Sequence, residues 1–199
     1  MKSSLIILMF FAVGLVLGLN RFVPSFFIEN DLTMYILYAL MFFVGIGIGS
    51  DTKAFKVIKE TKIKIILVPI CVIVGSLLGA GAVSFLFSEM NPREAMAVGA
   101  GFGYYSLSSI FITKISGEFL GTVALLSNIM RELITLVATP ILVKYFGSLA
   151  GIASGGATSM DSTLPIITEY TGKEWGIISI FSGIVLTIIV PFLVPFILS

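Results

Sequence analysis

A carboxylate and a run of hydroxyls interrupt an apolar segment in the last quarter of this chain. Residues 155–165 read Gly-Gly-Ala-Thr-Ser-Met-Asp-Ser-Thr-Leu-Pro, between two apolar stretches. A charge at the centre of a bilayer costs about 2.5 to 3.5 kcal/mol, and a broken backbone at that depth is tolerated only where protein or water covers it. Asp161 in such a break therefore predicts part of a transport pathway.

The composition indicates an integral membrane protein. Hydrophobic residues make up 57% of the chain and charged residues 12%, with a mean hydropathy of +1.11. The 199 residues leave room for roughly six to eight spans of about 20 residues and for no soluble domain beside them. We therefore expect one all-α membrane transport domain over residues 1–199. The net charge of +1 gives no reason to expect a nucleic-acid partner.

Apolar segments of membrane-spanning length follow one another along the chain. We expect about five full transmembrane helices and two interrupted or re-entrant segments, the latter at about residues 95–114 and 148–169. The first apolar segment is followed by no small-x-small cleavage pattern, so we interpret it as a retained span and not as a signal peptide. The expected full spans are residues 5–19, 32–49, 65–87, 119–146 and 175–198.

The distribution of lysine predicts the orientation in the membrane. Residues 50–64 carry most of the lysines, and short lysine-rich loops stay in the cytoplasm. The N-terminus is therefore expected inside and the C-terminus outside. In the expected third span, the small residues Gly75, Ser76, Gly79 and Gly81 predict close approach of another helix. The single Cys71 lies in the same apolar run and is interpreted as inert packing.

The two interrupted segments resemble each other. Residues 101–110 align with residues 155–164, and after a one-residue shift Ile112, Thr113 and Gly117 match Ile167, Thr168 and Gly172. Such a pair of interrupted apolar segments is the best sequence indication of a transporter's binding site. The single helix between them gives opposite orientations if both are re-entrant hairpins, and parallel ones if both span fully. We prefer the re-entrant, inverted-repeat arrangement. The helix-break residues are Gly101, Gly103, Gly155, Gly156 and Pro165.

Asp161 is the principal candidate for a binding residue. Thr163 or Ser162 fits the N-cap of a following helix, with Pro165 in its first turn, so Asp161 would stand just before a helix start. There it could bind Na⁺, H⁺ or an ammonium substrate. Hydroxyls and phenols could supply the neutral lining, or they could satisfy backbone groups in a tight interface. They are Tyr104, Tyr105, Ser106, Ser108, Ser109, Thr158, Ser159, Ser162 and Thr163.

The helix between the two segments carries a second polar cluster, Asn128, Arg131 and Glu132. The adjacent Arg131 and Glu132 do not face each other, so they must find different partners. Arg131 could neutralise Asp161 or bind a substrate carboxylate bidentately. Glu132 could accept a proton or a cationic group. A closed structural ion-pair network is the alternative.

Three ordered motifs resemble the bacterial lysine exporter family, LysO: residues 101–110, Asn-x-x-Arg-Glu-Leu-Ile at 128–134, and Gly-Ala-Thr-Ser-Met-Asp-Ser-Thr-Leu-Pro at 156–165. The resemblance covers essentially the whole chain, but only the C-terminal part of full-length members, which begin with a further unit of about three spans. It implies export of L-lysine and analogues across the bacterial cytoplasmic (inner) membrane, with Asp161 matching the family's carboxylate. A homodimer or a separately encoded small membrane subunit is the expected partner.

Other classes of protein fit less well. The chain has no histidine, which disfavours an enzyme with a Ser-His or His-Glu-x-x-His site, and no metal site or cofactor is expected beyond a coupling H⁺ or Na⁺. Any proton coupling must then use carboxylates such as Asp161 and Glu132. A hydroxyl-lined ion or solute channel, and a subunit that is inactive alone, remain the alternatives to a carrier.

Overall fold

The computed structural model describes residues 2–20, 42–43, 46, 65–86 and 90–199. Within these ranges every regular element is a helix, and no strand occurs among them, in agreement with the predicted all-α class. The expected second span at 32–49, apart from positions 42, 43 and 46, and the lysine-rich residues 50–64 lie outside the described residues.

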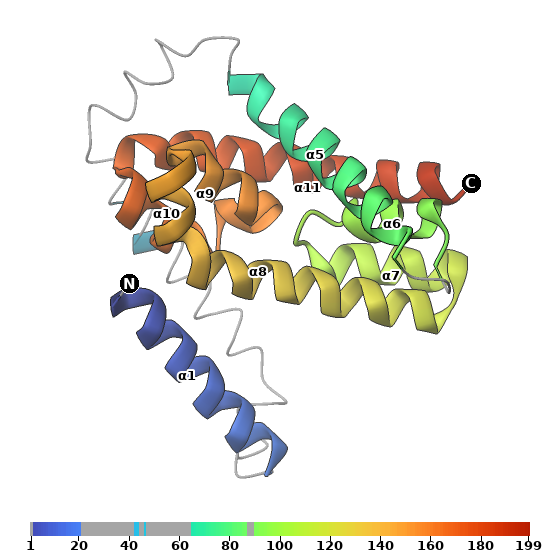
Figure 1. The fold of residues 1–199 in the computed structure, drawn as a ribbon, viewed down its shortest axis with the longest axis horizontal. Helices are drawn as coiled ribbons and strands as arrows, with labels where there is room; N and C mark the ends of the chain where they lie inside the picture. Colours follow the sequence, from blue (N-terminus) through green and yellow to red (C-terminus); the bar gives the residue numbers. More distant parts are fainter. Residues whose placement is uncertain (1, 21–41, 44–45, 47–64, 87–89) are drawn as a thin grey trace.

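Three helical stretches in the described part are long and apolar enough to cross a membrane. They are α5 (Leu67–Ser84), α8 (Glu118–Phe146), and the stretch Lys173–Leu198, which joins the short η3 (Lys173–Trp175) to α11 (Gly176–Leu198). These helices match three of the predicted spans. The first predicted span forms α1 (Lys2–Leu19), which contacts α8. Helices α8 and α11 run along the long axis of the molecule (Figure 1).

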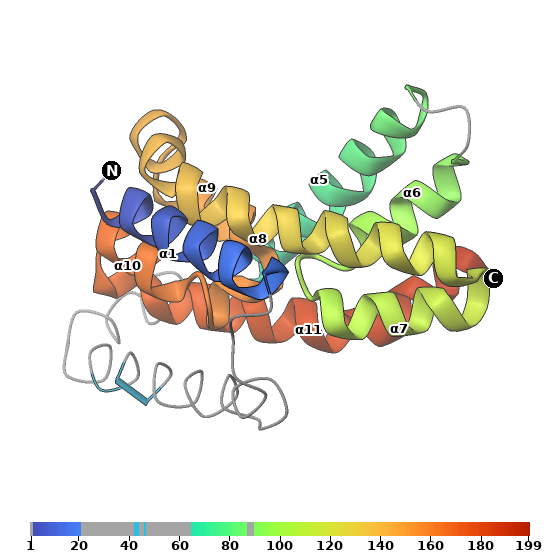
Figure 2. The same ribbon diagram turned by 90° about the horizontal axis from the view of Figure 1, so that it is seen from below.

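The first interrupted segment forms two short helices, α6 (Pro92–Gly99) and α7 (Tyr105–Ser116). A capping box starts α6, since the Glu94 backbone N–H donates to Asn91 Oδ1 (2.9 Å) and the Asn91 N–H donates to Glu94 Oε2 (3.0 Å). Helix α6 packs against α5, and α7 packs along α8. Both helices lie at the same end of the helical bundle. The chain runs along α6 towards the middle of the bundle and returns along α7 to the same end (Figure 2).

The second interrupted segment doubles back in the same way from the other end. It consists of α9 (Ser148–Gly155), the 3₁₀ turn η2 (Gly156–Met160) and α10 (Leu164–Thr171). Helices α9 and α10 contact each other and α8, at the end of α8 opposite to α7 (Figure 2). The tips of the two hairpins therefore meet near the middle of α8.

The return helices of the two segments both end at a glycine with positive φ. Gly117 follows α7 with φ +91°, and Gly172 follows α10 with φ +98°. In each case the glycine N–H donates to the threonine four residues earlier, Thr113 O or Thr168 O, at 3.0 Å. Helix α8 ends in the same way at Gly147, with φ +84° and its N–H donated to Val143 O, so the repeat stays a prediction.

The hydrophobic core forms around the hairpin tips. Phe102 and Ala157, one from each tip, belong to the same buried cluster as Ile112 of α7 and Leu186 of α11. Helix α11 contacts α6, α7 and η2 along its length. The last long helix therefore covers both hairpins and holds the two tips in contact.

We expect Gly156→Ala to lower the melting temperature of the purified protein. Gly156 has φ +61° and ψ −122°, and an added Cβ would collide with the Phe102 carbonyl oxygen. Strain of this kind costs about 1–3 kcal/mol. Gly75→Ala is the matched control, because a Cβ at Gly75 of α5 meets nothing within 4 Å. Equal melting temperatures for the two variants would contradict the close approach of the tips.

Cysteine labelling tests the doubled-back arrangement in cells. In a Cys71→Ser background, cysteines at Arg93 and Ser116 mark the two outer ends of the first hairpin, and cysteines at Phe146 and Lys173 flank the second. We expect an impermeant maleimide to label both members of a pair from one side, with the two pairs on opposite sides. Labelling of Arg93→Cys and Ser116→Cys from different sides would mean that the segment crosses the membrane.

Candidate transport site

The two hairpin tips bind each other directly through their backbones. The Ala157 N–H at the second tip donates to the Phe102 carbonyl at the first (2.8 Å). Phe102 has φ +49°, and it is fully buried together with Ala157. Backbone groups in a bilayer need partners inside the protein, so each break supplies what the other lacks. The predicted break glycines Gly101, Gly103, Gly155 and Gly156 all lie at or beside this crossing.

Asn128 of α8 holds the first tip. Its amide oxygen accepts from the Gly103 N–H (2.7 Å), and its amide nitrogen donates to Val98 O (3.2 Å) and Ala124 O (2.8 Å). Asn128 is buried, and these three bonds use its acceptor and both of its donors. Asn128, which belongs to the predicted polar cluster, therefore holds the backbone on both sides of the first break.

Arg131, one turn further along α8, holds the second hairpin. Its Nε and Nη2 donate to the carbonyls of Ser154 (2.9 Å) and Ala153 (3.0 Å), and Nη1 donates to Ser76 Oγ of α5 (2.9 Å). The two carbonyls belong to the last turn of α9, where the helix dipole favours a cation. Among the described residues Arg131 forms no ion pair. The structure therefore does not show the neutralisation of Asp161 by Arg131, which is one of the two roles predicted for Arg131.

Glu132, next to Arg131 on α8, is partly buried and takes no part in the hydrogen bonds of Arg131. The Ser162 hydroxyl donates to Asp161 Oδ1 at 3.3 Å. The loop that carries Asp161 leads into α10, and α10 packs against α8, the helix that carries Glu132.

Asp161 itself stands between η2 and α10, in the break that the sequence indicates. Its Oδ1 also accepts the backbone N–H of Ser162 (2.6 Å), and its side chain is partly buried. The N-cap position of α10 is Thr163, with Pro165 in the first turn, but the Thr163 hydroxyl donates to Thr158 O (2.9 Å) instead of capping the helix. The carboxylate is thus oriented by its own loop.

Three of the other predicted hydroxyls bind backbone carbonyls. Ser108 donates to Tyr104 O (3.0 Å), Thr158 to Gly155 O (3.0 Å), and Ser159 to Gly156 O (2.6 Å) and Ser179 O (3.0 Å). These three bonds are what we expect if the hydroxyls satisfy backbone groups in a tight interface. The role of the three hydroxyls as ligand groups stays a prediction. By contrast, Ser106 and Tyr105 are exposed at the start of α7, and Tyr104 and Ser109 are half-buried.

Sequence reasoning missed two residues that complete this arrangement. Ser179 of α11 donates its hydroxyl to Ser159 O (2.7 Å), and Ser76 of α5 accepts from Arg131. Ser76 belongs to the small-residue series that predicts close helix approach, which is the only sequence signal for it. Cys71 is exposed on the same helix. Among the described residues, no group of three His, Cys, Asp or Glu side chains could hold a metal ion.

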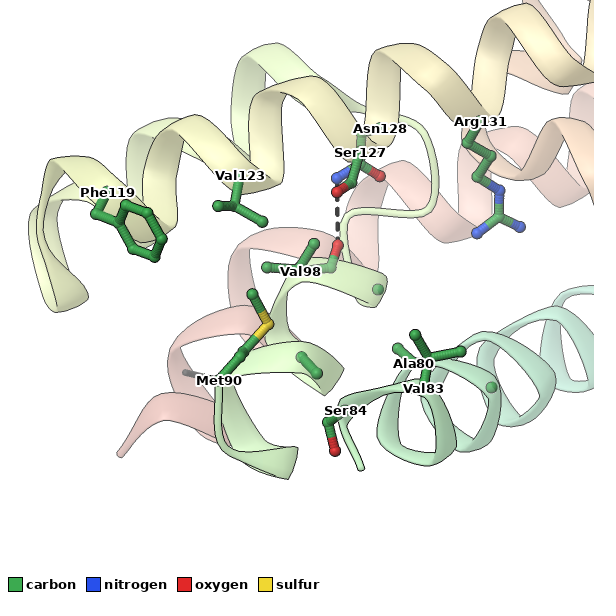
Figure 3. Close-up of a pocket in the computed structure, with 13 residues that line it drawn as sticks. Ala80, Val83, Ser84, Met90, Val98, Phe119, Val123, Ser127, Asn128 and Arg131 are labelled. Atoms are coloured by element: carbon green, nitrogen blue, oxygen red, sulfur yellow. Dashed lines mark hydrogen bonds between the residues drawn. The ribbon is translucent and has the colours of Figure 1, made fainter. Parts of the chain in front are cut away.

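A cavity of about 530 Å³ lies between α5, α6 and α8 (Figure 3). Its walls are mostly apolar, with Ala80 and Val83 on α5 and Val98 on α6, whereas Asn128 and Arg131 of α8 contribute polar groups. A second cavity of about 440 Å³ is lined by residues that include Ser76, Arg131, Cys71 and Ser154. Arg131 lines both cavities.

The long apolar helices, with two interrupted helical segments in contact near the middle of α8, indicate a helical membrane protein. Comparison with known proteins agrees with this class, since residues 8–198 match the family described as "Lysine exporter LysO". The chain therefore belongs to the LysO lysine exporter family, a family of the bacterial cytoplasmic membrane.

Two relatives illustrate the extent of the match. The chain is 34% identical to a Haemophilus influenzae protein named "Putative lysine exporter" over 167 residues, and this aligned region covers 84% of each chain. It is 32% identical over 186 residues to "Lysine exporter LysO" of Escherichia coli, which covers 92% of this chain and 60% of that relative. No solved structure matches the chain.

We expect Asn128→Ala to destabilise the protein by about 1–3 kcal/mol, because the Gly103 N–H and the Val98 carbonyl would lose their partner inside the core. The midpoint of unfolding of the purified protein measures this loss. Ser127→Ala, at the exposed neighbouring position on α8, is the matched control. A midpoint for Asn128→Ala equal to that of the control would show that Asn128 does not hold the first tip.

Proposed function

We propose that this protein is a secondary exporter of a cationic amino acid, L-lysine or a close analogue, and that Asp161 and Glu132 form its cation-binding site. Membership of the LysO family supports an amino-acid exporter, and both relatives carry lysine export in their names. The identity of the substrate comes from those names. The assignment of the site comes from the geometry.

The observation that carries the proposal is the position of Asp161 in the break between η2 and α10, where its carboxylate accepts from the N–H and the hydroxyl of Ser162. Asp161 and Glu132 are both partly buried, and among the described residues neither forms an ion pair with a basic side chain. Arg131, which precedes Glu132 on α8, is engaged by α9 and α5. Two like charges in a membrane interior are stabilised by a shared proton or a bound cation. An ammonium group, Na⁺ or H⁺ would meet this requirement.

Exposed polar residues at the hairpin crossing support a protein partner that covers this side of the molecule. Tyr105 is 36% exposed and Ser106 is also exposed, although both lie at the hairpin crossing and not at a membrane surface. Polar groups at this depth require protein or water around them. A homodimer or a separately encoded small membrane subunit would cover this side, and the E. coli relative has additional chain that could do the same.

The orientation follows from the lysine-rich residues 50–64, which we place in the cytoplasm. Helix α5 then runs outward, the first hairpin enters from outside and the second from the cytoplasm, and α11 ends outside. The acid pair lies between the two entrances. An exporter needs such a site to be reached from each side in turn, so we place the coupling cation or the substrate ammonium at the acid pair.

Counterflow of labelled lysine in liposomes tests the proposal. We expect Asp161→Asn and Glu132→Gln each to lower the initial rate by at least about tenfold, because loss of one charge weakens cation binding by about 1.4 kcal/mol or more. Glu118→Gln, an exposed carboxylate at the start of the same helix α8, is the matched control and should keep the rate of the unaltered protein.

Three outcomes would contradict the proposal in different ways. Full activity in both acid variants would remove the acid pair from the mechanism. Conductance that neither saturates nor changes with Asp161→Asn would indicate a channel. Complete inactivity of the purified chain, restored when a second membrane protein is added, would indicate a subunit of a two-component exporter.

A further inference from the structure

The cavity of about 530 Å³ is elongated along α8. Its lining takes every fourth position on one side of that helix: Phe119, Val123, Ser127 and Arg131. Figure 3 shows Phe119 and Arg131 at opposite ends of this row. Their separation in the helix corresponds to a rise of about 18 Å, and half of a bilayer's hydrocarbon core is about 15 Å thick. The cavity therefore extends from the start of α8 to its middle, about the depth of one leaflet.

One side of this cavity opens towards lipid. Val83 on α5 and Phe119 on α8 line the cavity and are 50% and 69% exposed, whereas Val98 of α6 is buried. Helix α6 thus forms the floor, and the opening lies between α5 and α8. Large apolar side chains are exposed on both helices outside the lining, such as Leu78 and Leu126. Because α5 and α8 are long and apolar enough to cross a membrane, the opening is continuous with the lipid-facing surface.

The polar groups at the inner end of the cavity already have partners. The Asn128 amide forms three hydrogen bonds with α6, the first tip and α8, and Arg131 donates to two carbonyls of α9 and to Ser76. At the end of α5 the Ser84 hydroxyl donates to Gly81 O (2.7 Å). The apolar lining residues include Ala80, Val83, Met90, Ala95, Val98, Phe119 and Val123. An ordered water needs about two to four polar partners, so this lining favours an apolar occupant over water or a charged solute.

We propose that one acyl chain of a membrane phospholipid fills this cavity. The acyl chain enters between α5 and α8 and extends from the level of Phe119 towards Asn128. A phospholipid fits this position because acyl chains surround the opening in the bilayer, and because a chain in one leaflet matches the depth and the apolar walls of the cavity. The inference depends on the membrane location of the protein and not on the proposed exporter function.

The bound acyl chain supports the first hairpin. Val98, whose carbonyl accepts from Asn128, lines the cavity, and so does Gly99 at the end of α6. An acyl chain against these residues adds van der Waals contacts between α6 and the two long helices beside it. Phospholipid should therefore raise the melting temperature of the detergent-purified protein.

Native mass spectrometry of the detergent-purified protein tests the site, because it counts the phospholipid molecules that stay bound. Ser127→Leu adds a branched apolar side chain in the middle of the α8 row. Thr122→Leu is the matched control, since Thr122 is an exposed hydroxyl residue of α8 outside the cavity lining. We expect the unaltered protein and the control to keep one phospholipid that Ser127→Leu binds at least about tenfold more weakly. Added phospholipid should raise the melting temperature of the first two only.

Photocrosslinking tests the depth of the acyl chain in the unaltered protein, so it decides the question even if Ser127→Leu does not fold. A phospholipid with a diazirine at the end of one acyl chain should label residues at the inner end of the cavity, such as Val98 and Asn128. A diazirine next to the headgroup should label the outer end, near Phe119 and Met90. Peptide mass spectrometry locates both sets of adducts.

The proposal is overturned if no phospholipid stays bound, if Ser127→Leu and Thr122→Leu retain it equally, or if the end-of-chain probe labels only residues outside the cavity. Detection of a dimer that Ser127→Leu converts to monomer, without a change in bound phospholipid, would show that a second copy of the chain covers the opening. That result would also overturn the lipid assignment.

Discussion

The hydrogen bond between Ala157 N and Phe102 O is the interaction on which the centre of this protein depends. A helix broken inside a bilayer leaves backbone groups without partners, and neither water nor lipid supplies them there. Here each break is satisfied by the other, and by two side chains of α8 that bind one break each. The glycines at the crossing are required because the backbones approach too closely for a Cβ, as at Gly156 beside Phe102 O.

Helix α8 organises the site through three neighbouring residues with three separate tasks. Asn128 binds the first tip, Arg131 binds the end of α9 and Ser76, and Glu132 is partly buried on the helix against which α10 packs. Because 128, 131 and 132 lie within about one turn, the positions of both hairpins and of the acid pair are fixed by one rigid element. The polar cluster therefore includes two residues that hold the hairpins, Asn128 and Arg131, and one residue of the proposed cation site, Glu132.

Much of this centre could be predicted from sequence, because its cost in a membrane leaves few alternatives. Glycines and hydroxyls around Asp161 could only belong to a break, and the adjacency of Arg131 and Glu132 required separate partners. The pairing of Arg131 with backbone carbonyls of α9 could not be predicted, because Ala153 and Ser154 carry no side-chain signal for it. The reciprocal Ser159 and Ser179 bonds were equally hidden, since serine in a membrane helix has many possible acceptors.

Those reciprocal bonds join the second tip to the last long helix. Ser159 Oγ donates to Ser179 O, and Ser179 Oγ donates to Ser159 O, between two fully buried residues. The loop that bears Asp161 is thereby fastened to α11 two residues before the carboxylate. Helix α11 also contacts α6 and α7. Any displacement of the Asp161 loop therefore has to break the two serine bonds or shift a helix that is packed against the other hairpin.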